Sequence, residues 1–160
     1  MDLPSFLPQV GLFRGLNDAE LSRMLLLCRL DSRGPGELIF AEGDDAVDLG
    51  VVMEGRAELR FEMPGREAGR EQTIFSVFPG KAFGWSALTP PFKLTLSVYG
   101  GEHGCRFFRV NGRELMSLFE EDNHIGFICL RNLAHVIAKR FHALEEEVVQ
   151  AAGLESMCRQ

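Results

Sequence analysis

The sequence is poor in the residues that build disulfide frameworks and metal centres. It has four cysteines in 160 residues and no C-x-x-C pair, and none of its four histidines lies two residues from another. Such spacing favours separate reduced thiols over a disulfide frame, a zinc site or an iron–sulfur cluster. The missing H-x-H pattern argues against the metal-dependent enzymes that are built on jelly-roll barrels. We therefore expect no metal site in this chain.

Signals for catalysis and for membranes are also absent. The chain contains no G-x-S-x-G elbow, P-loop or H-E-x-x-H motif, so we expect that it is not an enzyme. No apolar run approaches the length of a membrane span and no signal peptide opens the chain, which predicts a cytoplasmic location. A net charge of −6 argues against a general nucleic-acid surface, because such a surface needs clustered lysine and arginine.

The residues that are present suit one domain of ordinary composition. The chain is 46% apolar and 25% charged, and its length is close to that of a single domain with a real core. Its periodicity separates N-terminal helices in 1–30, a barrel in 31–111, C-terminal helices in 112–153 and a tail in 154–160. We expect these parts to form a single domain over residues 1–160.

The N-terminal zone and the middle zone differ in the spacing of their apolar residues. From Leu7 to Leu30 the spacing is helical, and Asn17 or Asp18 followed by Glu20 predicts a helix start. The middle zone is instead dense in glycine, with short runs of valine, isoleucine, phenylalanine and leucine. This pattern is typical of a jelly roll of short strands.

Two stretches of the middle zone predict local structure. Residues 57–63 alternate between apolar and polar, which indicates a half-buried strand. Residues 64–72 are polar and begin with Pro-Gly, which predicts an exposed, mobile hairpin loop. Arg56 and Arg60 lie on the alternating strand, either as surface charges or with one of them pointing into the barrel toward a phosphate.

A tight turn that begins at Gly84 carries the most specific chemistry in the sequence. Glycine permits a backbone conformation or a close approach that a residue with a Cβ resists. Residues 85–88 can then form one short helical turn whose free N–H groups attract anions. Pro90 and Pro91 end this turn, and Lys93 near the start of the next strand could supply the countercharge.

The turn predicts a phosphate-binding site within the barrel. The backbone N–H groups of Ser86 and Ala87 would hold the anion, and the Ser86 hydroxyl would be a further donor. Lys93 would neutralise the anion, while Gly84 would let it approach closely. We expect Trp85 to face a base or the pocket itself.

Glycine-containing segments in a fixed order extend this pattern over most of the chain. Residues 36–44 have the form G-x-x-I-x-x-x-G-D, residues 49–59 form a strand pair around Gly55, and residues 78–84 lead into the turn. With these segments the chain resembles the cyclic nucleotide-binding domain family, which includes the catabolite activator protein and the regulatory subunits of protein kinase A. The resemblance covers the chain from about Phe13 to the long C-terminal helix.

The resemblance implies a fold and a class of ligand. The fold is mainly β with flanking helices, a double-stranded β-helix jelly roll that is followed by a long C-terminal dimerisation helix. The implied function is a regulatory module that binds a cyclic nucleotide and needs no other cofactor. In the family, a glutamate after the Phe-Gly pair holds the ribose and an arginine at the next strand pairs with the cyclic phosphate.

This sequence departs from the family at both of those positions. Trp85 stands at the glutamate position, and the arginine position falls on Lys93 or, with a one-residue shift, on Phe92. Tryptophan has one donor and no acceptor, so it could stack on a base or plug the pocket, but it cannot accept a bond from a sugar hydroxyl. Lysine can neutralise a phosphate but does not provide a bidentate fork. Two interpretations stay open: a sensor of a nucleotide-like anion, and a degenerate, ligand-free dimerisation or docking scaffold.

The long C-terminal helix carries a second pattern. Apolar residues recur at spacings that alternate between three and four, which is the pattern of a coiled-coil seam. An amphipathic helix that covers its own barrel is the alternative, and we expect it for residues 125–133. Beyond Ile137 we expect a parallel homodimer, and Gly153 is expected to end the helix. The seam comprises Phe127, Leu130, Ala134, Ile137, Phe141, Leu144, Val148 and Ala151.

The end of the sequence and its histidines suggest limits on function. Few residues follow Gly153, so we expect a bacterial regulator without a DNA-binding part, whose signal passes through the homodimer or a separate partner. His103 and Cys105 could bind haem or metal, and His135 and His142 could share a metal across a coiled coil. Solvated side chains are the simpler interpretation for both pairs.

Overall fold

The structure of this protein, a computed structural model, describes residues 1–65 and 68–158, with side chains up to Gly153. It begins with four short helical segments. The second α-helix of this region starts where the sequence predicted. Asn17 and Glu20 cap its first turn with a capping box, whose hydrogen bonds are 2.8 and 3.0 Å long. The segments are α1 (Leu3–Phe6), η1 (Leu7–Gln9), η2 (Gly11–Phe13) and α2 (Asp18–Leu25).

In the described residues, six antiparallel strands form the barrel. Their order is β1-β6-β3-β4, with β2 paired to β6 and β5 paired to β3. The long strands β3 and β6 pair from Asp48 opposite Asn111 to Arg60 opposite Ser97, and shifts in their register divide the ladder into segments. The bounds are β1 (Cys28–Arg33), β2 (Leu38–Phe40), β3 (Asp48–Arg60), β4 (Thr73–Val77), β5 (Ala82–Phe83) and β6 (Ser97–Asn111).

The two largest apolar clusters among the described residues hold the fold together. One lies between the barrel and the helices and includes the fully buried Phe13, Phe108 and Leu115. The other fills the barrel, where the rings of Phe83 and Phe107 meet edge to face with centres 5.5 Å apart. The predicted fold class, a mainly β jelly roll with flanking helices and a long C-terminal helix, is confirmed.

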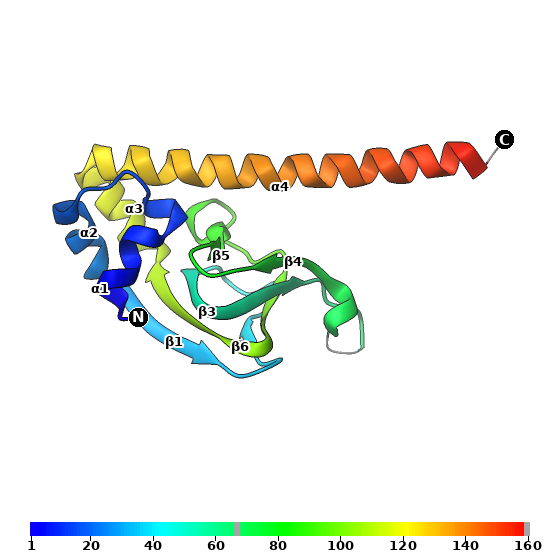
Figure 1. The fold of residues 1–160 in the computed structure, drawn as a ribbon, viewed down its shortest axis with the longest axis horizontal. Coiled ribbons are helices and arrows are strands. Elements are labelled where there is room, and N and C mark those ends of the chain that lie inside the picture. The colour runs from blue at the N-terminus through cyan, green and yellow to red at the C-terminus, as the bar shows by residue number, and fades with distance from the viewer. Residues whose placement is uncertain (66–67, 159–160) are drawn as a thin grey trace.

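Helix α3 (Gly112–Glu121) leads into the long helix α4 (Asn123–Cys158), which lies along one side of the barrel and extends beyond it (Figure 1). Asp122 caps α4, because its Oδ1 accepts from the N–H groups of His124 and Ile125. Asn132 fixes the helix to the N-terminal segment by donating 2.9 Å hydrogen bonds to the Leu12 and Arg14 carbonyls.

Helix α4 differs from the sequence prediction at its end. It continues through Gly153 to Cys158, so the segment predicted as a tail is helical at least to that residue. A single glycine lowers helix propensity by only about 1 kcal/mol, which is too little to end a long helix. Residues 159–160 and the Cys158 side chain lie outside the part that the structure describes.

The segment between β3 and β4 is also less exposed than the sequence predicted. It contains the short helix η3 (Arg70–Gln72), and Ala68 and Gln72 are buried. Arg60 is buried beneath it and donates to the Ala68 carbonyl at 3.1 Å. This part of the prediction was wrong because a buried arginine can tie a polar loop to the strand below it. Residues 66–67 lie outside the described residues.

Candidate ligand pocket

Gly84 sets the geometry of the turn that the sequence identified. Its φ of +76° lies in the left-handed region, where a residue with a Cβ is strained, and a Cβ there would lie 3.1 Å from the Asp48 carbonyl oxygen. The short 3₁₀ helix η4 (Trp85–Leu88) follows at once. The predicted helical turn is therefore present.

The turn presents fewer free amides than the sequence suggested. The Ala87 N–H donates to the Gly84 carbonyl at 3.1 Å and so closes the turn itself. The amides of Trp85 and Ser86 come before this first internal bond and have no partner within the turn. Ser86 is half-buried, whereas Ala87 is buried against Ala46 and Leu94.

A pocket of about 190 Å³ lies beside the turn. Gly84, Trp85 and Ser86 form one part of its wall. The barrel supplies Thr95 and several apolar side chains, and the long helix supplies Arg140. Among the residues that line it in the described part of the chain, none is acidic. The apolar side chains are Leu59, Phe75, Leu94, Leu96 and Val98.

Arg140 is the cation of this pocket, and sequence reasoning missed it. Its guanidinium carbon lies 4.3 Å from the centre of the Trp85 ring and 5.3 Å from that of Phe75, and its Nη2 donates to the Ala82 carbonyl at 3.3 Å. Burial lowers the pKa of Arg140, and no carboxylate within the described residues forms an ion pair with it. A half-buried cation without an acidic partner is suited to hold an anion.

One signal in the sequence could have indicated Arg140. It lies on the face of α4 that packs on the barrel, four residues after the half-buried Val136, in line with the buried Leu133. A charged residue on an inward-facing stripe needs a partner, a ligand or a route to solvent.

Lys93 lies apart from this pocket. Its Nζ forms a 2.5 Å ion pair with Asp45 Oδ1 on the surface, next to a β-bridge between the same two residues. This hydrogen bond lowers the pKa of Asp45. Ala87 and Phe92 line a separate pocket of about 470 Å³. The structure thus brings Gly84, Trp85 and Ser86 together and leaves Ala87 and Lys93 outside their pocket.

The predicted seam of α4 faces solvent. Phe141, for example, is 60% exposed, while the inward-facing Ile125, Cys129 and Leu133 of the same helix are buried. One face of α4 therefore covers the barrel, and a different face of α4 carries the apolar seam. The seam residues with exposed side chains are Phe127, Leu130, Ala134, Ile137, Phe141, Leu144, Val148 and Ala151.

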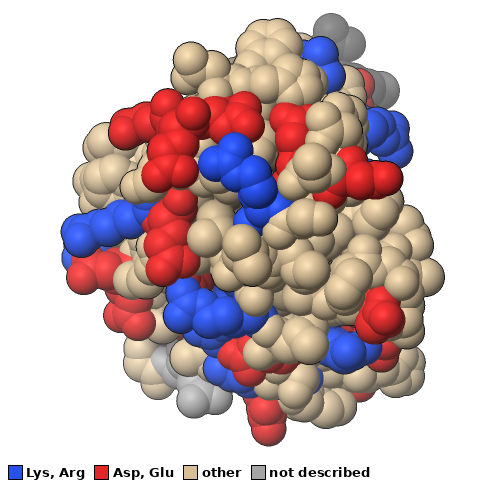
Figure 2. All heavy atoms as spheres, turned by 90° about the vertical axis from the view of Figure 1, so that its left-hand side faces the viewer, with Lys and Arg blue, Asp and Glu red and all other residues tan. Residues whose placement is uncertain are grey.

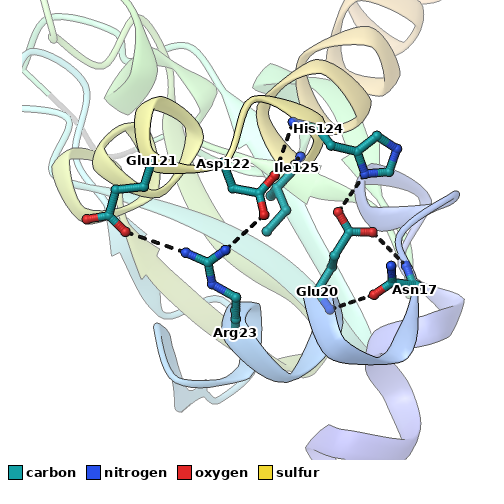
Figure 3. Close-up of polar contacts among 7 residues, drawn as sticks. All are labelled: Asn17, Glu20, Arg23, Glu121, Asp122, His124 and Ile125. Atoms are coloured by element: carbon teal, nitrogen blue, oxygen red, sulfur yellow. Dashed lines mark hydrogen bonds and ion pairs between the residues drawn. The ribbon is translucent and has the colours of Figure 1, made fainter.

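A polar junction that sequence reasoning also missed joins α2 to the start of α4 (Figure 3). Arg23 donates to Asp122 at 2.8 Å, and His124 Nδ1 lies 2.6 Å from Glu20 Oε2. The pKa of Glu20 is lowered by the backbone N–H of Asn17 and then by His124. Acidic and basic side chains are interspersed over the end of the molecule that carries these helices (Figure 2).

The other candidate groups do not assemble. His103 is exposed while Cys105 is buried in the barrel, and no group of three or more potential metal ligands occurs among the described residues. Burial raises the pKa of the Cys28, Cys105 and Cys129 thiols to about 12. No helix in the described ranges is both long and apolar enough to cross a membrane.

Comparison with solved structures shows which known proteins have a similar architecture. The chain is 29% identical to a candidate cyclic nucleotide-binding protein from Geobacter metallireducens, with a TM-score of 0.73 over 89% of this chain and 100% of that one. The chain has the fold of the cyclic nucleotide-binding domain family. No family model matches its sequence, and no curated protein does.

Two structures of lower identity show the same fold. The Thermus thermophilus catabolite activator protein has a TM-score of 0.70 at 22% identity, and the match covers 89% of this chain and 63% of that protein. The regulatory domain of Toxoplasma gondii PKA, solved with cAMP, has a TM-score of 0.60 at 23% identity, over 72% of this chain and 42% of that one. Because cyclic nucleotide-binding domains are regulatory and non-catalytic, the expectation that the chain is not an enzyme is confirmed.

Proposed function

We propose that this chain is a regulatory ligand-binding module of the cyclic nucleotide-binding type. It takes a small anion in the pocket beside Gly84 and passes the signal through a homodimer or a separate partner. The observation that carries the proposal is the half-buried, unpaired Arg140, which lines the same pocket as Trp85 and Ser86. Arg140 has no acidic partner among the described residues, so an anion in this pocket would gain a charge-assisted hydrogen bond from it.

Arg140 takes over the part that the resemblance gave to an arginine on the strand after the turn. It reaches the pocket from α4 instead of from the barrel. The planar guanidinium can bind two oxygens of one anion at once, which the ammonium of Lys93 cannot do. Ser86 would add its hydroxyl and its backbone N–H. Cyclic nucleotides are the first ligands to test, because related folds are described as binding them.

The proposal also includes a homodimer that forms through α4. Exposed apolar side chains such as Ile137, Phe141 and Leu144 form one stripe along α4, and such a stripe is stable in water when a second helix covers it. Arg140 precedes Phe141 in the chain, so a movement of Arg140 on ligand binding would shift the stripe. The ligand changes the dimer only if two dimer geometries bind it with different affinity.

A ligand-free scaffold is the second candidate. It is favoured by the position of Arg140 over the Trp85 and Phe75 rings, where the side chain itself occupies space next to the turn. In that case the fold would be kept for dimerisation or docking alone.

Calorimetric titration of the full chain with cyclic AMP, cyclic GMP and cyclic dinucleotides tests the proposal. Whichever of these ligands binds saturably should bind to Arg140→Ala more weakly by about 1 to 2 kcal/mol, the scale of a hydrogen bond to a charged group. Lys93→Ala and Arg131→Ala are the controls, because Lys93 is paired with Asp45 and Arg131 packs over Phe127 on the exposed side of α4. Binding that Lys93→Ala abolishes and Arg140→Ala spares would overturn the assignment of Arg140.

A further inference from the structure

The size of the pocket restricts the ligand more than its charge does. Its volume is about 190 Å³. An apolar cavity of roughly 150 Å³ accommodates one benzene molecule, and pockets for drug-sized ligands begin at about 300 Å³. A cyclic nucleotide combines a base, a ribose and a phosphate, which is far more than one ring.

The lining restricts the ligand further. The barrel side of the pocket is built from Leu59, Leu96 and Val98, together with the Phe75 ring. Besides Arg140, its polar side chains are the hydroxyls of Ser86 and Thr95 and the indole N–H of Trp85. No carboxylate lines it within the described ranges, so vicinal ribose hydroxyls would lack the charged acceptor that binds them strongly.

The charge of the pocket fits a single negative group. Arg140 is its one charged side chain in the described part of the chain. The aromatic contacts with Trp85 and Phe75 hold the guanidinium in place, and only Nη2 is engaged, by the Ala82 carbonyl. Arginine has five N–H donors in a fork that matches a carboxylate, so an edge remains for one carboxylate group.

We infer that the pocket takes a compact monoanion about the size of one ring, an aromatic or branched aliphatic carboxylate, and that Arg140 holds its carboxylate group. This inference rests on the proposed function and narrows its ligand. The apolar body of the ligand packs against Leu96 and Val98, and its carboxylate lies next to Ser86. The low polarity of the wall strengthens the pairing with Arg140.

Trp85 is the single tryptophan of the chain, so its fluorescence reports on this pocket directly. The experiment titrates the full chain with phenylacetate, with its neutral analogue phenylacetamide and with cyclic AMP. We expect saturable changes with phenylacetate, at a Kd between about 10 µM and 1 mM for a ligand of this size. Phenylacetamide should bind at least about tenfold more weakly, because it carries no charge for Arg140.

Four variants make the result specific. Arg140→Ala should weaken phenylacetate binding about tenfold or more, Arg140→Lys should restore part of it, and Arg131→Ala should leave it unchanged. Circular dichroism of each variant confirms that the chain is folded. Leu96→Phe should abolish binding by filling the pocket, with no loss of charge.

The other possible results separate a failure of the inference from a failure of the proposed function. If cyclic AMP binds and phenylacetate does not, the inference is wrong and the proposed function stands. Equal binding of acid and amide, unaffected by Arg140→Ala, would also contradict the inference, because the site would then be only apolar. If neither acid nor nucleotide changes the Trp85 signal or binds in calorimetry, both proposals fail and the ligand-free scaffold is the better description.

Discussion

The guanidinium of Arg140 lies 4.3 Å from the centre of the Trp85 ring, so the long helix α4 directly contacts the turn that begins at Gly84. One side chain thereby connects the pocket, the barrel and the helix whose outer face carries the apolar seam. Any event in the pocket that displaces Arg140 acts on α4 without an intermediate element.

The Arg140–Trp85 contact should be measurable without a ligand. We expect Arg140→Ala to lower the free energy of unfolding by about 1 kcal/mol and to move the Trp85 emission to longer wavelength, because the ring loses a partly desolvated cation and gains water. Arg131→Ala removes a similar contact with Phe127 on the exposed side of the same helix and should cost less than half as much. Urea unfolding followed by fluorescence and circular dichroism measures both effects. Equal losses in the two variants would contradict a special role for the buried pair.

The apolar seam of α4 should control the oligomeric state. We expect the double change Ile137→Glu with Leu144→Glu to convert the dimer to a folded monomer, since two charges per chain would face each other across the coil. Val149→Glu is a matched control, because Val149 is as exposed as Val148 but lies outside the seam. Sedimentation velocity at several protein concentrations distinguishes the species. A wild-type chain that stays monomeric at high concentration would disprove the homodimer.

Glu58 and Arg60 form the ion pair that should matter most for stability. Their side chains are only 3% and 6% exposed, and Glu58 also pairs with Arg56 at 2.9 Å. We expect Glu58→Leu alone to cost about 3 kcal/mol, because it leaves a buried cation unpaired, and Glu58→Leu with Arg60→Met to recover much of that loss. Chemical unfolding of the single and double variants measures the difference. If the double variant is as unstable as the single one, the loss comes from packing instead of the unpaired charge.

The same pair predicts how stability depends on pH. Burial of Glu58 opposes ionisation, but hydrogen bonds from Arg60 and Arg56 and their charges outweigh it, so the pKa of Glu58 is lowered. A carboxylate with a lowered folded-state pKa contributes stability above its unfolded pKa, and this contribution is lost as the pH falls through the folded value. Stability should therefore decline below about pH 4, the ordinary range of a glutamate, and decline less in the double variant. Unfolding curves between pH 3 and 7, in steps of roughly one unit, would show this difference.

The junction of α2 with α4 should depend on Glu20. We expect Glu20→Gln to lower stability by about 1 kcal/mol, because it weakens the contact with His124 as well as half of the capping box. Glu121→Gln is the comparison, since Glu121 is 71% exposed and its ion pair with Arg23 is long, at 3.5 Å. Thermal unfolding at neutral pH should separate the two variants. A Glu121→Gln loss as large as that of Glu20→Gln would contradict this account of the junction.

Local conformational preferences and the spacing of apolar residues are enough to predict the local structure and the pattern of the fold. Gly84 and the turn after it, the cap at Asn17 and the apolar stripe on α4 all follow from the conformational preferences of neighbouring residues, so a single sequence predicts them. The order of the glycine-containing segments was enough to indicate the jelly roll. The end of α4 was predicted wrongly because one glycine weakens a long helix without breaking it.

Which charges meet depends on the packing of elements that are far apart in the chain. Arg140 and the Ala82 carbonyl are 58 positions apart in the chain, and Glu20 and His124 are 104 apart. Lys93, the nearer candidate in sequence, pairs with Asp45 on the surface, whereas the folding of α4 along the barrel brings Arg140 to the pocket. Periodicity indicates which face of a helix is buried, but the partner of a charged side chain depends on how distant elements pack against one another.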